Sequence, residues 1–268
     1  MQVALIIPAR YNSSRLSGKP LITIAGKTLI ERVFAIAQAA IKDFFNIQVV
    51  VATEDERVAD FCGDRNIACV ITPASCRTGS DRAFAAAQQL TNPPDFVVNM
   101  QGDNPLAPPW FIRALIEQAQ RDTNIKVITP CVALSWAELE LLQKNKAITP
   151  FSGTCVIRDK NNNAIWFSKN IIPLVRYKRF ASDSEKSPVL RHIGIYGYRY
   201  AALQRFSSLP RGDYEVIEEL EQLRFLENGI SIRLHEVNYH GRSGMSGIDS
   251  PEDIKRAEAI IAREGEIA

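Results

Sequence analysis

The sequence predicts an α/β protein with a mostly parallel central sheet, helices on both faces of that sheet, and an inserted segment made of a β-hairpin and a loop. Over the first 125 residues, short runs that are apolar throughout alternate with segments of helical period. This alternation is typical of parallel strands that are buried on both faces. Hairpin and turn signals replace it further along. No linker interrupts the 268 residues, so we predict one domain at 1–268, with a first half at 1–125 and a second half at 126–268.

The individual elements follow from the local patterns. In the first half, β-branched and other apolar residues run together in four expected strands, at 3–7, 47–52, 68–71 and 95–100. Apolar residues recur at helical spacing in four expected helices, at 29–40, 55–65, 80–90 and 110–120. In the second half we expect a strand at 127–134, a hairpin of 154–157 with 164–167, a charged exposed loop at 176–188, a strand at 190–199, a helix at 214–227, a strand at 230–237 and a helix at 250–263.

The composition excludes several classes of protein. Hydrophobic residues make up 46% and charged residues 23%, and 32 Lys and Arg against 30 Asp and Glu leave a net charge of +2. A charge so close to zero gives no general reason to expect nucleic acid or a membrane surface as partner. Five scattered cysteines without a CxxC pair predict neither a disulfide framework nor a zinc site. The N-terminus is typical of a strand rather than a signal peptide, which predicts a cytoplasmic protein.

The loop after the first strand is the first candidate binding site, because ligands of open parallel sheets bind beyond the carboxyl ends of the strands. Over residues 8–20 it carries Arg10, Arg15 and Lys19 together with hydroxyl groups and a glycine. Such a loop can bind a polyphosphate through backbone N–H groups and cations. It has neither the GxxxxGK[ST] nor the GxGxxG spacing. The alternative is a solvated basic loop.

Two acidic positions are candidate ligands of Mg²⁺. Asp103 follows the fourth strand beside Gly102, and Asp249 follows a glycine-rich stretch just ahead of the last helix. Mg²⁺ commonly takes one or two protein carboxylates together with phosphate oxygens. The alternatives are a turn stabilised by Asp103 and a helix cap at Asp249 or Ser250.

A further candidate is the strand expected at 190–199. His192, Tyr196 and Tyr198 fall on one face of such a strand, because side chains repeat with period two. They are suited to a polar ligand pocket, although two tyrosines on a strand also suit an ordinary core. No Ser or Cys nucleophile accompanies His192.

These segments resemble the 3-deoxy-manno-octulosonate cytidylyltransferase (CMP-Kdo synthetase) family. The matching motifs run in order along nearly the whole chain. They are IPARYNSSRLSGKPL (7–21), VVAT (50–53), TGSDR (78–82), QGDNP (101–105), RHIGIYGYR (191–199), LEQLR (220–224) and IDSPED (248–253).

The resemblance implies a Rossmann-like nucleotidyltransferase fold with a nucleotide-binding first half and a sugar-binding and dimerisation second half. It implies Mg²⁺-dependent transfer of CMP from CTP to the anomeric hydroxyl of 3-deoxy-manno-octulosonate (Kdo). The products are CMP-Kdo, used for lipopolysaccharide or capsule synthesis, and pyrophosphate. Positioning and charge neutralisation suffice for this reaction, which agrees with the lack of an evident nucleophile.

Roles follow from the matching positions. The implied catalytic residues are Arg10, Lys19, Asp103 and Asp249, and the last two would bind Mg²⁺. The implied nucleotide-binding residues are Pro8, Ala9, Arg10, Arg15, Lys19, Ser80, Arg82 and Gln101. The implied sugar-binding residues are Gln101, Lys169, His192, Tyr196, Glu221 and Gln222.

A homodimer is expected from the family and from the inserted segment. The apolar side chains of the inserted segment must be shielded from water, and a second subunit would bury them. They are Trp166, Phe167, Ile171, Ile172 and Val175.

The sequence also departs from the family. Ser17 replaces a proline, Cys76 replaces a histidine, Asn104 replaces Glu or Gln, and Lys169 replaces an arginine. Asn104 and Lys169 change the charge expected at the rim of a sugar pocket, as an amino-substituted sugar would require. The alternative is neutral drift at a solvated edge.

Three hypotheses therefore remain at this point. The first is a cytidylyltransferase for Kdo. The second is a cytidylyltransferase for a related sugar acid, such as 8-amino-Kdo or a nonulosonic acid. The third is a non-catalytic nucleotide- or sugar-binding protein of the same fold, which would have little need of Asp103, Asp249 and Lys19 together.

Overall fold

The computed structural model describes residues 1–11, 16–175, 186–245 and 247–268. Contacts divide the chain into two units. The first consists of Met1–Thr123, Ile195–Ser207 and Tyr239–Ala268, and the second of Asn124–Gly194 and Ser208–Asn238. The chain thus passes from the first unit to the second and back twice, so neither unit is one continuous stretch.

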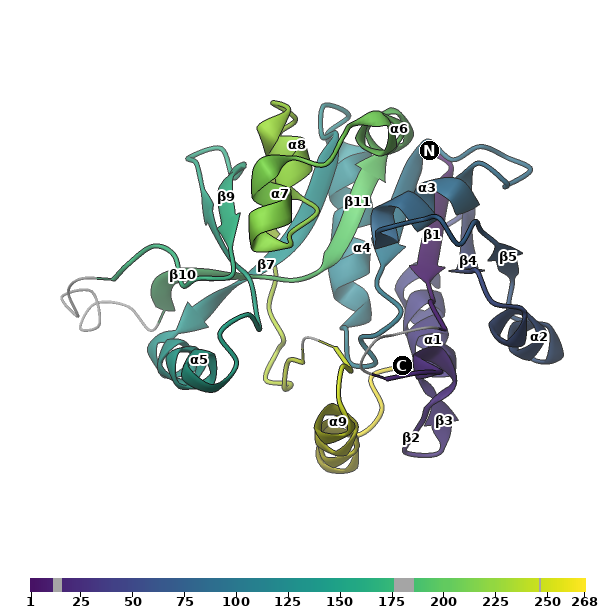
Figure 1. Cartoon of the computed structure of the whole chain (residues 1–268), viewed down its shortest axis with the longest axis horizontal. Helices are drawn as coiled ribbons and strands as arrows, with labels where there is room; N and C mark the ends of the chain where they lie inside the picture. Colours follow the sequence, from purple (N-terminus) through teal and green to yellow (C-terminus); the bar gives the residue numbers. More distant parts are fainter. Residues whose placement is uncertain (12–15, 176–185, 246) are drawn as a thin grey trace. The chain divides into compact units, whose positions relative to one another are not determined.

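The sheet of the first unit follows the order β5-β4-β1-β6-β11 (Figure 1). Strands β1 (Val3–Pro8), β4 (Ile47–Thr53), β5 (Cys69–Ile71) and β6 (Phe96–Met100) are parallel, and β11 (Ile195–Arg199) is antiparallel to β6. Every residue of β1 and β6 is buried, because helices exclude water from both faces. The predicted parallel strands are confirmed.

Helices pack around this sheet at the places that the periodicity predicts. α1 (Leu29–Ile41) packs against α4 (Pro109–Arg121), and α3 (Gly79–Ala87) packs against β1, β4 and β6. α2 (Glu56–Asp64) lies against β4 and β5. The remaining elements of this unit are η1 (Lys19–Leu21), β2 (Thr23–Ile24), β3 (Lys27–Thr28), α6 (Tyr200–Ser208) and α9 (Pro251–Glu264).

The sheet of the second unit follows the order β12-β7-β10-β8-β9. β7 (Val127–Ser135) pairs in parallel with β12 (Ile232–Glu236) and antiparallel with β10 (Lys186–His192). β8 (Cys155–Arg158) and β9 (Ala164–Ser168) form the predicted hairpin. The helices of this unit are α5 (Trp136–Ile148), α7 (Asp213–Glu218) and α8 (Leu223–Glu227).

Two elements expected to be continuous are broken. The strand expected at 190–199 is divided into β10, in the second unit, and β11, in the first. His192 therefore does not share a strand face with Tyr196 and Tyr198. The helix expected at 214–227 is divided into α7 and α8 by Glu219, whose φ of 50° is left-handed and ends a helix.

Two helices were missed by the periodicity. In α5 only Leu139 is buried, so no apolar stripe marks this helix. Ser135 nevertheless forms a capping box with Glu138, and that pair was a readable start signal. α6 begins at Tyr200 directly after β11. Of the loop expected at 176–188, residues 186–188 belong to β10 and the rest lie outside the described residues.

The apolar side chains of the inserted segment are largely covered within their own unit, which corrects the argument that they need a second subunit. Phe167 is fully buried. Ile171, Ile172 and Val175 pack against a core cluster of the second unit. Its members are Leu134, Leu139, Cys155 and Val189. Among the described residues of this unit, the large apolar side chains that are exposed are different ones, namely Leu141, Ile148, Phe151, Ile165, Leu174, Tyr214, Val216 and Ile217.

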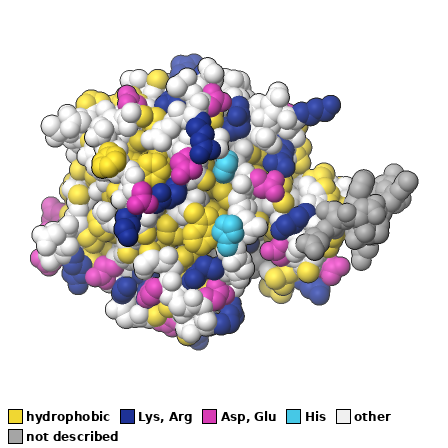
Figure 2. Space-filling view, turned by 180° about the vertical axis from the view of Figure 1, so that it is seen from behind, with side chains coloured by type: hydrophobic (Ala, Val, Ile, Leu, Met, Phe, Trp, Pro, Cys, Tyr) yellow, Lys and Arg dark blue, Asp and Glu magenta, His cyan; other side chains and the backbone are white. Residues whose placement is uncertain are grey.

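The surface agrees with the small net charge. On the face drawn in Figure 2, basic and acidic side chains are interspersed rather than separated by sign. None of the helices in the described residues is both long and apolar enough to cross a membrane.

Candidate functional site

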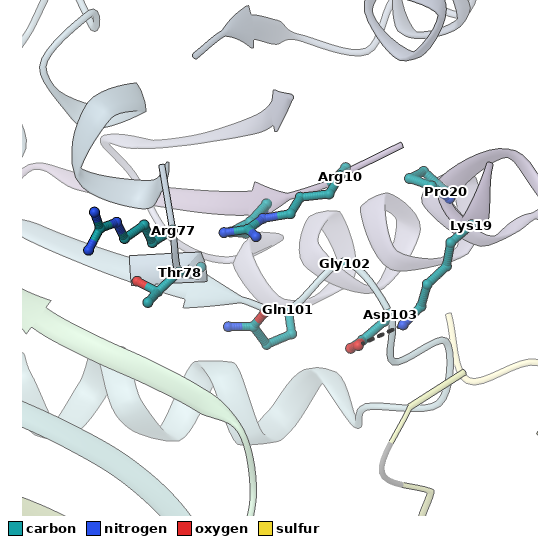
Figure 3. A pocket seen from close by; sticks show the side chains of 11 residues that line it. Arg10, Lys19, Pro20, Arg77, Thr78, Gln101, Gly102 and Asp103 are labelled. Carbon is teal, nitrogen blue, oxygen red and sulfur yellow. Dashed lines mark hydrogen bonds and ion pairs between the residues drawn. The ribbon is translucent and has the colours of Figure 1, made fainter. Parts of the chain in front are cut away.

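A pocket of about 470 Å³ opens in the first unit where β1 and β6 end. Its lining comes from the loop after β1, the start of α3 and the turn after β6 (Figure 3). The lining residues are Pro8, Ala9, Arg10, Lys19, Pro20, Arg77, Thr78, Gly79, Gln101, Gly102 and Asp103. The carboxyl-end edge of the parallel strands is therefore where the pocket lies, as the sequence predicts.

Gly102 allows the turn after β6 to approach β1. A Cβ atom built on Gly102 would lie 2.4 Å from the backbone oxygen of Pro8, a distance that no side chain tolerates. A Cβ atom on Gly79 would lie 2.7 Å from Nε2 of Gln101. Gly102 thus lets the turn with Asp103 approach the end of β1, and Gly79 lets the start of α3 approach Gln101.

Lys19 joins the two predicted metal ligands. Its Nζ lies 3.0 Å from Oδ2 of Asp103 and 3.0 Å from Oδ1 of Asp249, and only 12% of its side chain is exposed. Three segments that are far apart in the sequence thus place one cation and two carboxylates at one point. Figure 3 shows the end of the Lys19 side chain beside the carboxylate of Asp103.

Burial and the charges of this group shift the pKa values of Lys19 and Asp103. Burial by itself lowers the pKa of Lys19, but the carboxylates of Asp103 and Asp249 outweigh burial and raise that pKa above its usual value. Burial raises the pKa of Asp103, and repulsion from Asp249 adds to this effect while Lys19 opposes it. Lys19 therefore stays protonated, and the two carboxylates are suited to a partner of high positive charge.

The start of α9 shows which of the two candidates, Asp249 or Ser250, caps that helix. Ser250 is the N-cap, and Asp253 completes its capping box. The side chain of Asp249 instead points to Lys19. Ser250 therefore caps α9, and Asp249 belongs to the cluster with Lys19.

The residues present fit a divalent cation bound jointly with a phosphate ligand. Two carboxylates converge within hydrogen-bond distance of one Lys19 nitrogen. Among the described residues, no group of three or more His, Cys, Asp or Glu side chains could hold a metal ion by itself. Mg²⁺ sites often consist of one or two carboxylates completed by substrate phosphates and water, and Asp103 with Asp249 is such a donor set.

Some of the other nucleotide candidates line the pocket, and others do not. Pro8, Ala9, Arg10 and Gln101 line the pocket, and Arg10 donates a hydrogen bond of 2.9 Å to the backbone oxygen of Cys76. Arg15 lies outside the described residues.

Ser80 and Arg82 are almost fully buried and have partners within the protein. The hydroxyl of Ser80 lies 2.9 Å from that of Tyr198, and Arg82 pairs with Glu54 at 2.9 Å. Neither residue lines the pocket, and their contact with a nucleotide stays a prediction.

Arg77 and Thr78 line the pocket but were not among the predicted site residues. Thr78 caps α3 and forms a capping box with Asp81. The signal for both was their place between a strand and a capped helix at the same sheet edge. Arg77 is exposed, so it adds a positive charge to the wall of the pocket beside Arg10.

The sugar candidates are divided between the units. Gln101 and Tyr196 belong to the first unit, and Lys169, His192, Glu221 and Gln222 to the second. Glu221 and Gln222 lie in the turn between α7 and α8, not on a helix.

His192 is neutral in this environment, because burial lowers its pKa to about 3. Its Nε2 lies 2.9 Å from the hydroxyl of Thr129, and that hydroxyl donates its proton to the backbone oxygen of Ile193. A proton on Nε2 of His192 would satisfy both contacts, because Thr129 would then accept from His192 and donate to Ile193.

The two departures that change the expected charge, Asn104 and Lys169, have different surroundings. Asn104 is only 9% exposed, so the expectation of a solvated edge was wrong for it, and its place at the rim of a sugar pocket stays a prediction. Lys169 pairs with Glu219 at 3.2 Å, and the backbone N–H of Lys169 donates to Glu218.

Comparisons with known proteins identify the family. A profile described as Cytidylyltransferase matches residues 4–232. A 3-deoxy-manno-octulosonate cytidylyltransferase of Maricaulis maris is 43% identical over 267 residues and covers 100% of both chains. One of Anaeromyxobacter dehalogenans is 40% identical over 263 residues, which are 97% of this chain and 98% of the relative.

A solved structure has the same fold over the whole chain. It is a CMP:2-keto-3-deoxy-manno-octonic acid synthetase complexed with CTP, with a TM-score of 0.81 and 33% identity over 98% of this chain and 100% of the other. A cytidylyltransferase of Leptospira borgpetersenii, with a TM-score of 0.62 and 16% identity over 98% of this chain and 87% of the other, shares the fold. The full-length matches show that the chain belongs to the 3-deoxy-manno-octulosonate cytidylyltransferase family.

Proposed function

We propose that this protein transfers a cytidylyl group from CTP to the anomeric hydroxyl of Kdo and releases pyrophosphate. The observation that supports this most directly is the convergence of Lys19, Asp103 and Asp249 beside a pocket at the sheet edge. The full-length relatives, which carry this activity in their names, support the choice of nucleotide and sugar.

The reaction needs little from the protein beyond positioning of the two substrates and neutralisation of phosphate charge. The sugar oxygen forms a bond to the α-phosphorus, the bond from that phosphorus to the bridging oxygen breaks, and the hydroxyl proton is lost to water. Negative charge grows on the departing pyrophosphate. Fixed cations next to this charge lower the barrier because they need no reorganisation.

Lys19 and Arg10 supply fixed positive charge from this chain. Lys19 is held by two carboxylates, so its ammonium group is oriented before CTP binds. Arg10 is oriented by its hydrogen bond to the Cys76 oxygen. Arg77 on the same pocket wall is a further cation for the triphosphate.

Asp103 and Asp249 would hold a divalent cation, which we propose to be Mg²⁺. When bound with the triphosphate, this ion supplies further neutralisation of phosphate charge. The residues of this chain contribute the two carboxylates and keep their separation small through Lys19.

Within the second unit, Lys169 and Gln222 are the best-supported contacts of the sugar acid. His192 is neutral and brings no charge to the sugar carboxylate, whereas Lys169 is a cation. Gln222 is 4% exposed, and its Nε2 has no hydrogen-bond partner among the described residues. A buried amide in this state is suited to a ligand oxygen.

We further propose that the protein acts in the cytoplasm as a homodimer.

The test is pyrophosphate release from CTP and Mg²⁺ with Kdo, 8-amino-Kdo and a nonulosonic acid in parallel. We expect release with Kdo, together with the mass of CMP-Kdo in the product. A strong preference for 8-amino-Kdo would move the assignment to a modified sugar. Binding of CTP without release on any of the three would contradict an enzymatic function.

A further inference from the structure

Asn104 is a buried side chain that links two segments of the first unit. It follows Asp103 in the turn after β6 and is 9% exposed. Its Oδ1 accepts a hydrogen bond of 3.1 Å from the backbone N–H of Leu106, and its Nδ2 donates one of 3.1 Å to the backbone oxygen of Met245. The first bond orients the amide, and the second reaches a segment 141 residues further along the chain.

The segment that Asn104 reaches is the one that carries Asp249. Met245 is 3% exposed and Ile248 is fully buried, so both residues are packed against the protein. The backbone N–H of Ile248 donates 2.8 Å to the backbone oxygen of Asp103. Gly247 approaches Asp103 closely, since a Cβ atom there would lie 3.3 Å from its carboxylate carbon.

We propose that Asn104 is a positioning residue that holds the Asp249 segment against Asp103, so that the two carboxylates converge for a divalent cation. This inference rests on the proposed function of that pair. The printed hydrogen bonds of Asn104 go to Leu106 and Met245 and to neither carboxylate, so it acts on the segment whose Ile248 bonds to the backbone of Asp103.

The need for such a residue follows from the geometry of metal sites. Ligand distances must be kept within about 0.2 Å. Lys19 contacts only the carboxylate groups, so the backbone that carries Asp249 needs a separate anchor. Residues that orient metal ligands typically change metal affinity by roughly 10- to 100-fold when they are replaced.

The test replaces Asn104 by Asp in the full-length protein. Asp has nearly the same shape and still accepts from Leu106, but it cannot donate to Met245. We expect the Mg²⁺ concentration for half-maximal activity to rise by roughly tenfold, with little change in the KM for Kdo. Mn²⁺ binding in the presence of CTP, followed by electron paramagnetic resonance, should weaken by a similar factor and does not depend on turnover.

The matched control is Asn228→Asp. Asn228 donates the same kind of bond, 2.9 Å from Nδ2 to the backbone oxygen of Arg224, in the second unit. We expect this variant to lose stability only, with metal binding unchanged. If Asn104→Asp does not fold, Asn104→Ala provides the same test, because it removes the donor without adding a charge.

The outcomes separate this inference from the proposed function. A folded Asn104 variant with normal Mn²⁺ binding and a normal Mg²⁺ curve would overturn the positioning role, even if its melting temperature fell. Equal weakening in Asn228→Asp would overturn it as well. If the unchanged protein released no pyrophosphate, the proposed function would fail, whereas Mn²⁺ binding would still report on Asn104.

Discussion

Arg224 binds the carboxylate of Glu215 through two hydrogen bonds, 2.7 Å from Nε to Oε2 and 2.6 Å from Nη2 to Oε1, with 4% and 2% of the two side chains exposed. This ion pair joins α7 to α8 on either side of the turn that carries Glu221 and Gln222. The candidate sugar residues are thus held by a buried pair whose partners are nine residues apart.

The first prediction concerns the removal of this pair. Glu215→Gln should lower the free energy of unfolding by about 3–5 kcal/mol, because it leaves the Arg224 charge buried without its counter-ion. The control is Glu236→Gln, since the Glu236 pair with Arg158 is 45% and 33% exposed and should contribute less than about 1 kcal/mol. Urea unfolding at pH 7 measures both. Equal losses in the two variants would contradict the prediction.

The same pair makes stability depend on pH. Burial raises the pKa of Glu215, but the hydrogen bonds and charge of Arg224 outweigh burial and lower that pKa in the folded state. Its contribution is therefore complete above the unfolded pKa of about 4.3 and is lost as the pH falls through the folded pKa. Glu215→Gln should show a shallower loss of stability below that pH than the unchanged protein.

The second prediction concerns the two carboxylates beside Lys19. Asp103→Asn and Asp249→Asn should each reduce kcat by roughly a hundredfold or more while the protein stays folded, because each removes a charge from the proposed metal site. Glu252→Gln is the control, since this exposed carboxylate lies on α9 only three residues from Asp249. Near-normal turnover in either Asp variant would reject the assignment.

The third prediction separates chemistry from sugar binding at Lys19. Lys19→Ala should lower kcat by more than it raises the KM for Kdo, because the charge matters most as pyrophosphate departs. Steady-state kinetics with CTP at saturation provide both constants. A variant that changed only the KM for Kdo would require another cation to take this role.

The fourth prediction tests the close approach at Gly102. Gly102→Ala should reduce activity strongly and lower stability by about 1–3 kcal/mol, because its Cβ would collide with the Pro8 backbone. Gly63→Ala is the control: a Cβ there meets nothing within 4 Å, and the residue lies inside α2. Thermal melting and a pyrophosphate assay should show that only the first variant is impaired.

The fifth prediction concerns the homodimer. Sedimentation should give twice the chain mass, and the double variant Phe151→Glu with Leu174→Glu should give a monomer, because these side chains are 77% and 88% exposed. Phe45→Glu serves as the control, since Phe45 is 89% exposed in the first unit. A monomeric mass of the unchanged protein at all concentrations would refute the expectation.

The sequence by itself determined the parallel strands of the first unit and the place of its pocket. Strands buried on both faces must be apolar throughout, so β1, β4 and β6 could be read directly. Since ligands bind beyond the carboxyl ends of such strands, Arg10, Lys19 and Asp103 could be assigned to one edge. The capping signal of Ser250 was also readable, because a helix cap depends on neighbouring residues only.

Only the tertiary structure decided what depends on contacts between distant segments. The left-handed backbone at Glu219, which ends α7, has no local signal such as a glycine. The separation of β10 from β11 places His192 and Tyr196 in different units, although they are close in sequence. Asp249 could cap a helix or pair with Lys19, and Asn104 could be exposed or buried. Contacts between segments more than a hundred residues apart decide both questions. Local propensity does not predict such long-range contacts, because burial and charge pairing depend on the partners that folding brings together.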